Sequence, residues 1–264
     1  MLLAIDTGNT QTALGLFSGE ELVRSWRMPT DASFTKDELH VRLLGYLRMY
    51  DLSLESVDAM AFAGVVPQLL REWQGVAAQL GCAFVQVGPD TAGVTAIDAP
   101  NPGEVGADRV ANATAAAELY GAPSIVVDFG TATNIDVVNA AGAYIGGAIA
   151  PGLRISMDAL TARAARLASV PLEAPGHAIG RTTAEAVQSG LVAGAAAMAE
   201  GLVARIQREL GPEGRAARVI ATGGLASVVA TCTDAFDVVD QQLTLKGIRI
   251  IWERLRERGE DAGR

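Results

Sequence analysis

The stretch IVVDFGTAT (Ile125–Thr133) ends an apolar run with Asp128, turns on Gly130 and continues with small hydrogen-bonding residues. The stretch AIDTGNT (Ala4–Thr10) follows nearly the same plan near the start of the chain. A glycine in such a turn lets backbone amides approach an anion, and Asn or Thr beside it adds further donors. One occurrence alone is most simply a tight turn, whereas two occurrences at matching places indicate a pair of phosphate loops.

The aspartate of each turn repels phosphate, but it can hold the cation that accompanies a nucleotide or orient a water on that cation. We therefore expect the two turns, one from each half of the chain, to bind a polyphosphate from both sides.

The elements around the two turns repeat one order. In the first half the pattern predicts strands at 2–6, 12–17, 22–28, 57–63 and 83–87, with helices at about 35–50, 67–80 and 107–120. In the second half it predicts strands at 124–128, 134–138, 143–149, 218–222 and 236–239, with helices at 155–167, 183–210, just after Gly224 and at 245–258. Both halves read βββαβαβα. This repeat predicts an α/β fold of two similar domains, 1–121 and 122–264, with a ligand cleft between them.

Composition narrows the classes of partner. Half of the 264 residues are hydrophobic, and the formal net charge is -9, which disfavours binding to nucleic acid. Cys82 and Cys232 fit no metal-ligand spacing and are expected to be reduced core thiols. Neither a basic leader nor an apolar run of the length that a membrane span needs is apparent. We therefore expect a cytoplasmic protein without a membrane partner.

Two enzyme classes share one of the acidic motifs and are disfavoured by the rest of the chain. Asp-Thr-Gly occurs in aspartic proteases, but these need two carboxylates on an all-β scaffold, and the predicted helices contradict that. Asp-Phe-Gly occurs in protein kinases, but no His-Arg-Asp catalytic loop is found in the sequence.

Five motifs in order carry a resemblance to one family. They are DTGNT at 6–10, GADR at 106–109, DFGTAT at 128–133, GGAIAPGL at 146–153 and TGGL at 222–225, together with NPGEVGADR and TTAEAVQSG. In this order and spacing the chain resembles type III pantothenate kinases over nearly its whole length. The resemblance implies the duplicated ribonuclease-H-like (actin-like ATPase) fold shared by acetate kinase, sugar kinases, Hsp70 and actin.

The resemblance also implies a reaction and its ligands. The reaction is ATP-dependent phosphorylation of pantothenate to 4'-phosphopantothenate, the first step of coenzyme A biosynthesis, with Mg²⁺ and a monovalent cation, K⁺ or NH₄⁺. The implied ATP-binding residues are Asp6, Thr7, Gly8, Asn9, Thr10, Gly130, Thr131, Ala132, Gly223 and Gly224. The implied substrate-binding residues are Gly106, Ala107, Asp108, Arg109 and Thr183, with Asp6 near Mg²⁺ and Asp128 as the ligand of the monovalent cation.

Asp108 is the residue implied to accept the proton of the substrate hydroxyl, and Arg109 is implied to pair with the pantothenate carboxylate. Taken without the family, each residue has a simpler interpretation. Asp108 opens a predicted helix, where an acidic residue is favoured as a cap. Arg109 is placed to form a surface ion pair with Glu104 or Glu118.

The Gly- and Ala-rich segment 186–199 lacks bulky side chains and is expected to pack closely against another helix. By resemblance this partner is the same helix of a second copy in a homodimer, and close packing within one chain is the alternative. His40 and His177 follow no ligand or triad spacing and are expected to be structural or exposed.

The chain departs from the family pattern beside the substrate pocket, at 99–102, at Asn134 and Ile135, and at Val192 and Ala193. These changes concern the affinity for pantothenate rather than the phosphoryl transfer. Two other functions remain compatible with the fold: a non-catalytic regulatory relative similar to the Bvg accessory factor proteins, and a kinase for another small hydroxylated substrate such as a sugar.

Overall fold

The computed structural model describes residues 1–91, 96–164 and 167–259. The chain forms two compact units. The first comprises Met1–Ala115 and the C-terminal segment that starts at Thr244, and the second comprises Ala116–Leu243. The units differ from the predicted halves, 1–121 and 122–264, chiefly in the C-terminal helix, which belongs with the first unit.

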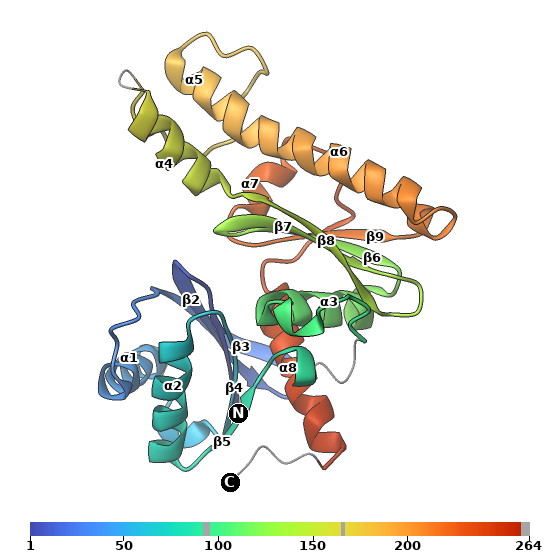
Figure 1. Cartoon of the computed structure of the whole chain (residues 1–264). Helices are drawn as coiled ribbons and strands as arrows, with labels where there is room; N and C mark the ends of the chain where they lie inside the picture. The colour runs from blue at the N-terminus through green and yellow to red at the C-terminus, as the bar shows by residue number, and fades with distance from the viewer. Residues whose placement is uncertain (92–95, 165–166, 260–264) are drawn as a thin grey trace. The chain divides into compact units, whose positions relative to one another are not determined.

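A five-stranded sheet in the order β3-β2-β1-β4-β5 forms the centre of the first unit (Figure 1). The strands are β1 (Leu2–Thr7), β2 (Gln11–Ser18), β3 (Glu21–Pro29), β4 (Ala59–Gly64) and β5 (Ala83–Gln86). β1 pairs antiparallel with β2 and parallel with β4, so it is the central strand. Its nearly continuous apolar run follows from burial on both faces.

The second unit contains a sheet of the same design, in the order β10-β9-β6-β7-β8. The strands are β6 (Ser124–Phe129), β7 (Ala132–Val138), β8 (Tyr144–Pro151), β9 (Arg218–Thr222) and β10 (Val238–Val239). β6 pairs antiparallel with β7 and parallel with β9, as β1 does with β2 and β4. Two sheets of equal order and direction confirm the predicted duplicated ribonuclease-H-like fold.

Two helices cover one face of the first sheet, α1 (Lys36–Arg48) and α2 (Pro67–Leu80). A capping box of Thr35 and Glu38 starts α1, within the helix predicted at about 35–50. Pro67 opens α2, and Gly81 at φ 68° ends it in the left-handed conformation that favours glycine. Buried leucines of α1 and Trp73 of α2 pack against the strands in one hydrophobic core.

The other face of the first sheet is covered by the C-terminal helix α8 (Leu243–Glu257), where the Leu245 side chain approaches Gly15 of β2. Figure 1 shows this red helix beside the blue strands of the same unit. Helix α3 (Ala107–Tyr120) starts in the first unit and runs into the second.

The second core forms between the second sheet and the helices α4 (Leu153–Arg163), α6 (Gly194–Glu209) and α7 (Ala226–Ala230). α5 (Thr183–Gln188) continues into α6 through a π-helical turn, Ser189–Ala193, so the predicted helix 183–210 is present with a π turn inside it. The predicted helix 155–167 extends in part over residues 165–166, which lie outside the described residues.

The continuous helix Thr183–Glu209 is long and apolar enough, by length and composition alone, to cross a membrane, and it is the one such helix within the described ranges. Its most apolar stretch is 28% buried, and Val192, Ala196 and Ala199 belong to the core of the second unit. A helix that packs one face on a core meets the same criteria, so this feature is weak evidence for a span.

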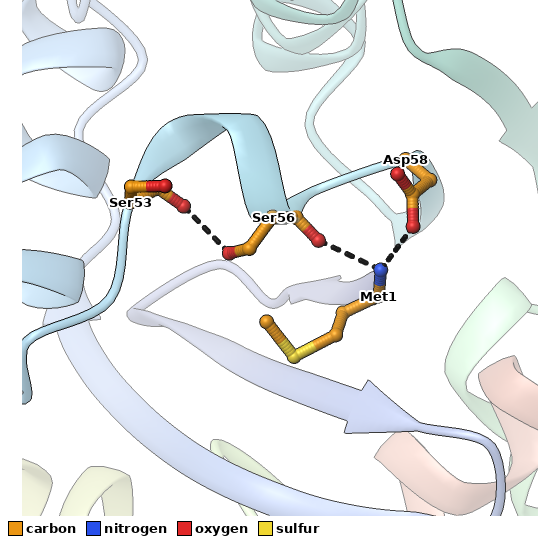
Figure 2. A network of polar contacts seen from close by, with 4 residues as sticks. All are labelled: Met1, Ser53, Ser56 and Asp58. Atoms are coloured by element: carbon orange, nitrogen blue, oxygen red, sulfur yellow. Dashed lines mark hydrogen bonds and ion pairs between the residues drawn. The ribbon is translucent and has the colours of Figure 1, made fainter.

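The amino group of Met1 anchors the start of β1 next to β4 (Figure 2). It donates to the Ser56 carbonyl at 2.7 Å and also contacts the Asp58 carboxylate. The Ser56 hydroxyl in turn donates to the Ser53 carbonyl at 2.6 Å. These contacts bring the residues before β4 to the beginning of β1, which agrees with the parallel register of Leu2 with Ala59.

Candidate active site

The first predicted phosphate loop is the turn between β1 and β2. The Gly8 N–H donates to the Gln11 carbonyl at 3.0 Å, and the Thr30 N–H donates to the Thr10 carbonyl at 2.9 Å. Asp6 is half-buried at the end of β1, whereas Asn9 and Thr10 are exposed. The backbone hydrogen bonds therefore hold an exposed polar turn directly after a partly shielded carboxylate.

The GADR segment opens helix α3, with Asp108 in the first turn. A methyl group at Gly106 would lie 2.5 Å from Asp108 Oδ1, so the carboxylate rests against the Gly106 backbone. The Val110 N–H donates to the Gly106 carbonyl at 3.0 Å and starts the helix there. Asp108 and Arg109 are both half-buried, and the N-terminal end of the helix favours the negative charge of Asp108.

Helix α8 holds α3 from one side. The Thr244 hydroxyl donates to Asn112 Oδ1 at 2.8 Å, one turn after Asp108, and Asn112 is buried. At Gly247 the two helices touch through their backbones, because a methyl group there would lie 2.0 Å from the Ala111 carbonyl oxygen. These contacts position the helix that carries Asp108. Reasoning from the sequence missed them, although a glycine within the helical pattern of α8 was a signal of close packing.

The second predicted phosphate loop is the turn between β6 and β7. The Gly130 N–H donates to the Ala132 carbonyl at 3.0 Å, and Gly130 and Thr131 are exposed at its tip. Asp128 is half-buried two residues before Gly130, as Asp6 is two residues before Gly8. The two turns thus have the same order of carboxylate, glycine and exposed polar residue.

Two further glycines lie against the second loop. A methyl group at Gly223 would lie 2.4 Å from Asp128 Oδ1, and one at Gly152 would lie 2.1 Å from the Thr131 carbonyl oxygen. Gly223 also has φ 93°, which other residues rarely adopt. The structure therefore brings the PGL and TGG motifs against the DFGTAT motif, with Gly152 at Thr131 and Gly223 at Asp128. Gly152 lay within a motif that the sequence singled out, but no role had been predicted for it.

Thr183 is the first residue of α5 and is exposed. Its neighbour Thr182 is the N-cap, and Glu185 completes a capping box. His40 is half-buried on α1 and His177 is exposed, and neither belongs to the groups described above.

The carboxylates of the candidate site can each supply a single acidic ligand. Within residues 1–91, 96–164 and 167–259 no group of three or more His, Cys, Asp and Glu side chains is arranged to hold a metal ion. Mg²⁺ in kinases is held by one or two carboxylates together with the phosphates of the nucleotide. Asp6 and Asp128 each offer one half-buried carboxylate in their own unit, and Gly130 and Gly223 lie close to that of Asp128.

The comparisons with known proteins settle the family. The family model described as type III pantothenate kinase matches residues 2–205. The chain belongs to the type III pantothenate kinase family. A type III pantothenate kinase of Streptomyces avermitilis is 46% identical over 262 residues, covering 96% of this chain and 98% of that relative. One from Thermomicrobium roseum is 48% identical over 257 residues, covering 97% and 98%.

A solved structure of low identity agrees with the fold. A Campylobacter jejuni protein described as a Baf family transcriptional activator aligns with a TM-score of 0.61 at 17% identity, covering 98% of this chain and 99% of that chain. At that identity the likeness shows the fold alone. The predicted membership of the type III pantothenate kinase family is confirmed, and neither the regulatory nor the sugar-kinase alternative is favoured by the relatives.

Proposed function

We propose that the chain catalyses ATP-dependent phosphorylation of pantothenate to 4'-phosphopantothenate, the first step of coenzyme A biosynthesis. The observation that carries this proposal is the match to type III pantothenate kinases over nearly the full length of the chain and of its relatives. The two acidic, glycine-lined turns at equivalent places of two equivalent sheets support it, because phosphoryl transfer depends on positioning and charge neutralisation.

Each unit supplies one phosphate loop for ATP in this proposal. The backbone and side chains of the first turn, Asp6 to Thr10, bind phosphate oxygens, and Gly130, Thr131 and Ala132 do so in the second unit. Gly223 and Gly224 contact the adenosine part. The support from geometry is that both turns are tied by backbone hydrogen bonds and leave their tips exposed, so little ordering is needed when the phosphates bind.

Asp108 orients the primary hydroxyl of pantothenate and takes its proton as the bond to phosphorus forms. Phosphoryl transfer depends mainly on positioning, which suits an acceptor that orients the hydroxyl and takes the proton late in the reaction. Arg109 pairs with the pantothenate carboxylate through its planar, forked guanidinium. Gly106, Ala107 and Thr183 complete the substrate contacts. The resting place of the Asp108 carboxylate against Gly106 supports its assignment as a fixed orienting group.

Two cations accompany ATP in the proposal. Asp6 would hold Mg²⁺, and Asp128 would hold K⁺ or NH₄⁺. When bound, these ions neutralise phosphate charge and so favour transfer. The role of Asp128 is supported by its place at the end of β6, where Gly223 lies so close that a methyl group there would be 2.4 Å from Asp128 Oδ1.

The working form is a cytoplasmic homodimer without a membrane or nucleic-acid partner. The long helix supports this assembly. Its exposed side carries small residues such as Gly194, Ala197 and Gly201, while Ala196 and Ala199 pack into the core of the same unit. Small residues allow two helices to approach closely, so both packing within the chain and packing with a second copy are accommodated.

A substrate panel tests the function. Purified protein is incubated with ATP, Mg²⁺ and K⁺ and with pantothenate, hexoses or glycerol, and ADP formation is measured for each. The proposal expects ADP formation that depends on pantothenate. Turnover with a hexose in place of pantothenate, or folded protein without any turnover, would contradict it.

A further inference from the structure

The segment before Thr183 is tied to helix α5 by side chains of that helix. The Glu185 carboxylate accepts the N–H groups of Arg181 at 2.7 Å and Thr182 at 3.2 Å. The Thr182 hydroxyl accepts the Glu185 N–H at 3.2 Å and closes the capping box. One carboxylate oxygen therefore fixes the two peptide groups that immediately precede Thr183.

The same segment is attached at two more places, where the helix turns into its π-helical part. The Gln188 side chain donates to the Pro171 carbonyl at 2.9 Å, and the Ser189 hydroxyl donates to the Ala178 carbonyl at 2.7 Å. At Gly180 the backbones touch, because a methyl group there would lie 2.2 Å from the Ala186 nitrogen. The segment 171–182 is thus held against α5 from both ends, although its residues are largely exposed.

We propose that Glu185 is a positioning residue for pantothenate binding, which sets the backbone before Thr183 and with it the direction of the Thr183 hydroxyl. The inference rests on the proposed function, in which Thr183 contacts pantothenate. A single helix cap would need only the Thr182 hydroxyl, whereas here Glu185 also captures the Arg181 peptide outside the helix. That additional hydrogen bond restrains the position of the backbone before α5. Small displacements of a group that binds substrate have large effects on affinity.

The chain contains a matched control, because α1 has a capping box of the same type. There Glu38 accepts the Thr35 N–H at 2.9 Å and the Thr35 hydroxyl at 3.0 Å. Glu38 and Glu185 are both exposed, both occupy the third position of their helices, and both follow a threonine N-cap. Alanine at either position removes a similar capping interaction, but only Glu185 is next to a proposed substrate contact.

The experiment compares Glu185→Ala, Glu185→Gln and Glu38→Ala with the wild-type protein in steady-state assays that vary pantothenate and ATP separately. Glu185→Ala is expected to raise KM for pantothenate about tenfold, which corresponds to ~1.4 kcal/mol. Its kcat should stay within about twofold and its KM for ATP should not change, because uniform binding of one substrate is what is lost. Glu185→Gln keeps an acceptor oxygen, so its KM for pantothenate should be close to that of the wild type. Glu38→Ala should lower Tm about as much as Glu185→Ala does, but it should leave KM for pantothenate unchanged.

Gly180→Ala provides an independent variant of the same segment, and it should raise KM for pantothenate in the same direction. A wild-type KM in Glu185→Ala with the expected loss in Tm would overturn the inference, as would an equal rise in KM for Glu38→Ala. A wild-type protein that does not phosphorylate pantothenate overturns the proposed function itself. Active wild-type protein with an unresponsive Glu185→Ala overturns the positioning role alone.

Discussion

The two sheets share one topology, yet the helices that follow their fifth strands begin with different chemistry. After β5 the chain enters α3 through Gly106, with Asp108 in the first turn, whereas α8 after β10 has no acidic residue in its first turn. Leu243 and Leu245 of α8 are buried. The first turn of α3 thus carries a half-buried carboxylate, whereas the equivalent first turn of α8 packs against α3.

The ends of the central strands β1 and β6, in contrast, are alike in the two units. Asp6 pairs across the sheet with Ala63, and Asp128 pairs with Thr222 at the equivalent position. A glycine follows each partner, Gly64 in the first unit and Gly223 in the second. The surroundings of these glycines differ: a methyl group at Gly64 would meet the Phe62 ring at 2.5 Å, and one at Gly223 would meet Asp128 Oδ1 at 2.4 Å. The carboxylate at the strand end and the glycine after its cross-strand partner therefore occur in both units, whereas an acidic first turn occurs in α3 and not in α8.

The strongest test of this division is Asp108→Asn, because the proposal gives the reacting carboxylate to one unit only. We expect kcat to fall about 10²–10⁴-fold, the contribution usual for a positioned proton acceptor. Binding of ATP, measured by calorimetry, should be retained, because the substitution leaves both turns that are proposed to bind the phosphates unchanged. Near wild-type kcat in this variant would remove the role assigned to Asp108.

The equivalent carboxylates Asp6 and Asp128 provide a second, smaller test as a matched pair of asparagine variants. Asp6→Asn should raise the Mg²⁺ concentration for half-maximal activity about tenfold, since the variant loses the charged ligand that the proposal assigns to Mg²⁺. Asp128→Asn should weaken activation by K⁺ instead and leave the Mg²⁺ dependence close to that of the wild type. Titrations of each cation at saturating ATP measure both. Identical Mg²⁺ and K⁺ titrations for the two variants would show that the two carboxylates do not bind different ions.

The smallest effects concern the hydrogen bonds that hold α3 in each unit. The Thr244 hydroxyl donates to Asn112 in the first unit, and the Tyr120 hydroxyl donates to the Asp240 carboxylate at 2.8 Å in the second. Burial, the hydrogen bond to Asp240 and the charge of Asp240 raise the pKa of Tyr120 to about 12 from an ordinary value of 10.0. We expect Thr244→Val and Tyr120→Phe each to cost about 1–2 kcal/mol in the free energy of unfolding at neutral pH.

The two variants should differ in their pH dependence. Because the folded state binds the Tyr120 proton more tightly than the unfolded state, this stabilisation is complete below pH 10 and is lost as the pH rises towards 12. The difference in Tm between wild type and Tyr120→Phe should therefore shrink between about pH 10 and pH 12. The Thr244→Val difference should not shrink over that range, since no titrating group is removed. Parallel pH profiles for both variants would contradict the raised pKa of Tyr120.

Much of the fold could be predicted from local signals. The apolar run of β1 and the cap signals at Thr35, Pro67 and Gly81 each specify an element within a few residues. The repeated acidic turns then imply the duplicated topology, which the two sheets confirm. These signals are read from neighbouring residues, so one sequence is sufficient for them.

The features that could not be predicted depend on contacts between distant parts of the chain. Gly247 touches Ala111, and Gly152 touches Thr131, through backbone contacts that no periodicity reveals. For the same reason the periodicity of α8 indicates a buried face but does not say that it packs in the first unit. The π turn at Ser189–Ala193 lies inside the helix that the sequence predicts as continuous over 183–210.

The most direct test of the account is to follow the phosphoryl group itself. Phosphorus NMR of a reaction with ATP, Mg²⁺, K⁺ and pantothenate should show a new phosphomonoester coupled to a methylene group, in an amount equal to the ADP formed. That result would place the γ-phosphoryl group on the primary hydroxyl of pantothenate. Formation of ADP with inorganic phosphate alone, or a phosphoester on another group, would contradict the account.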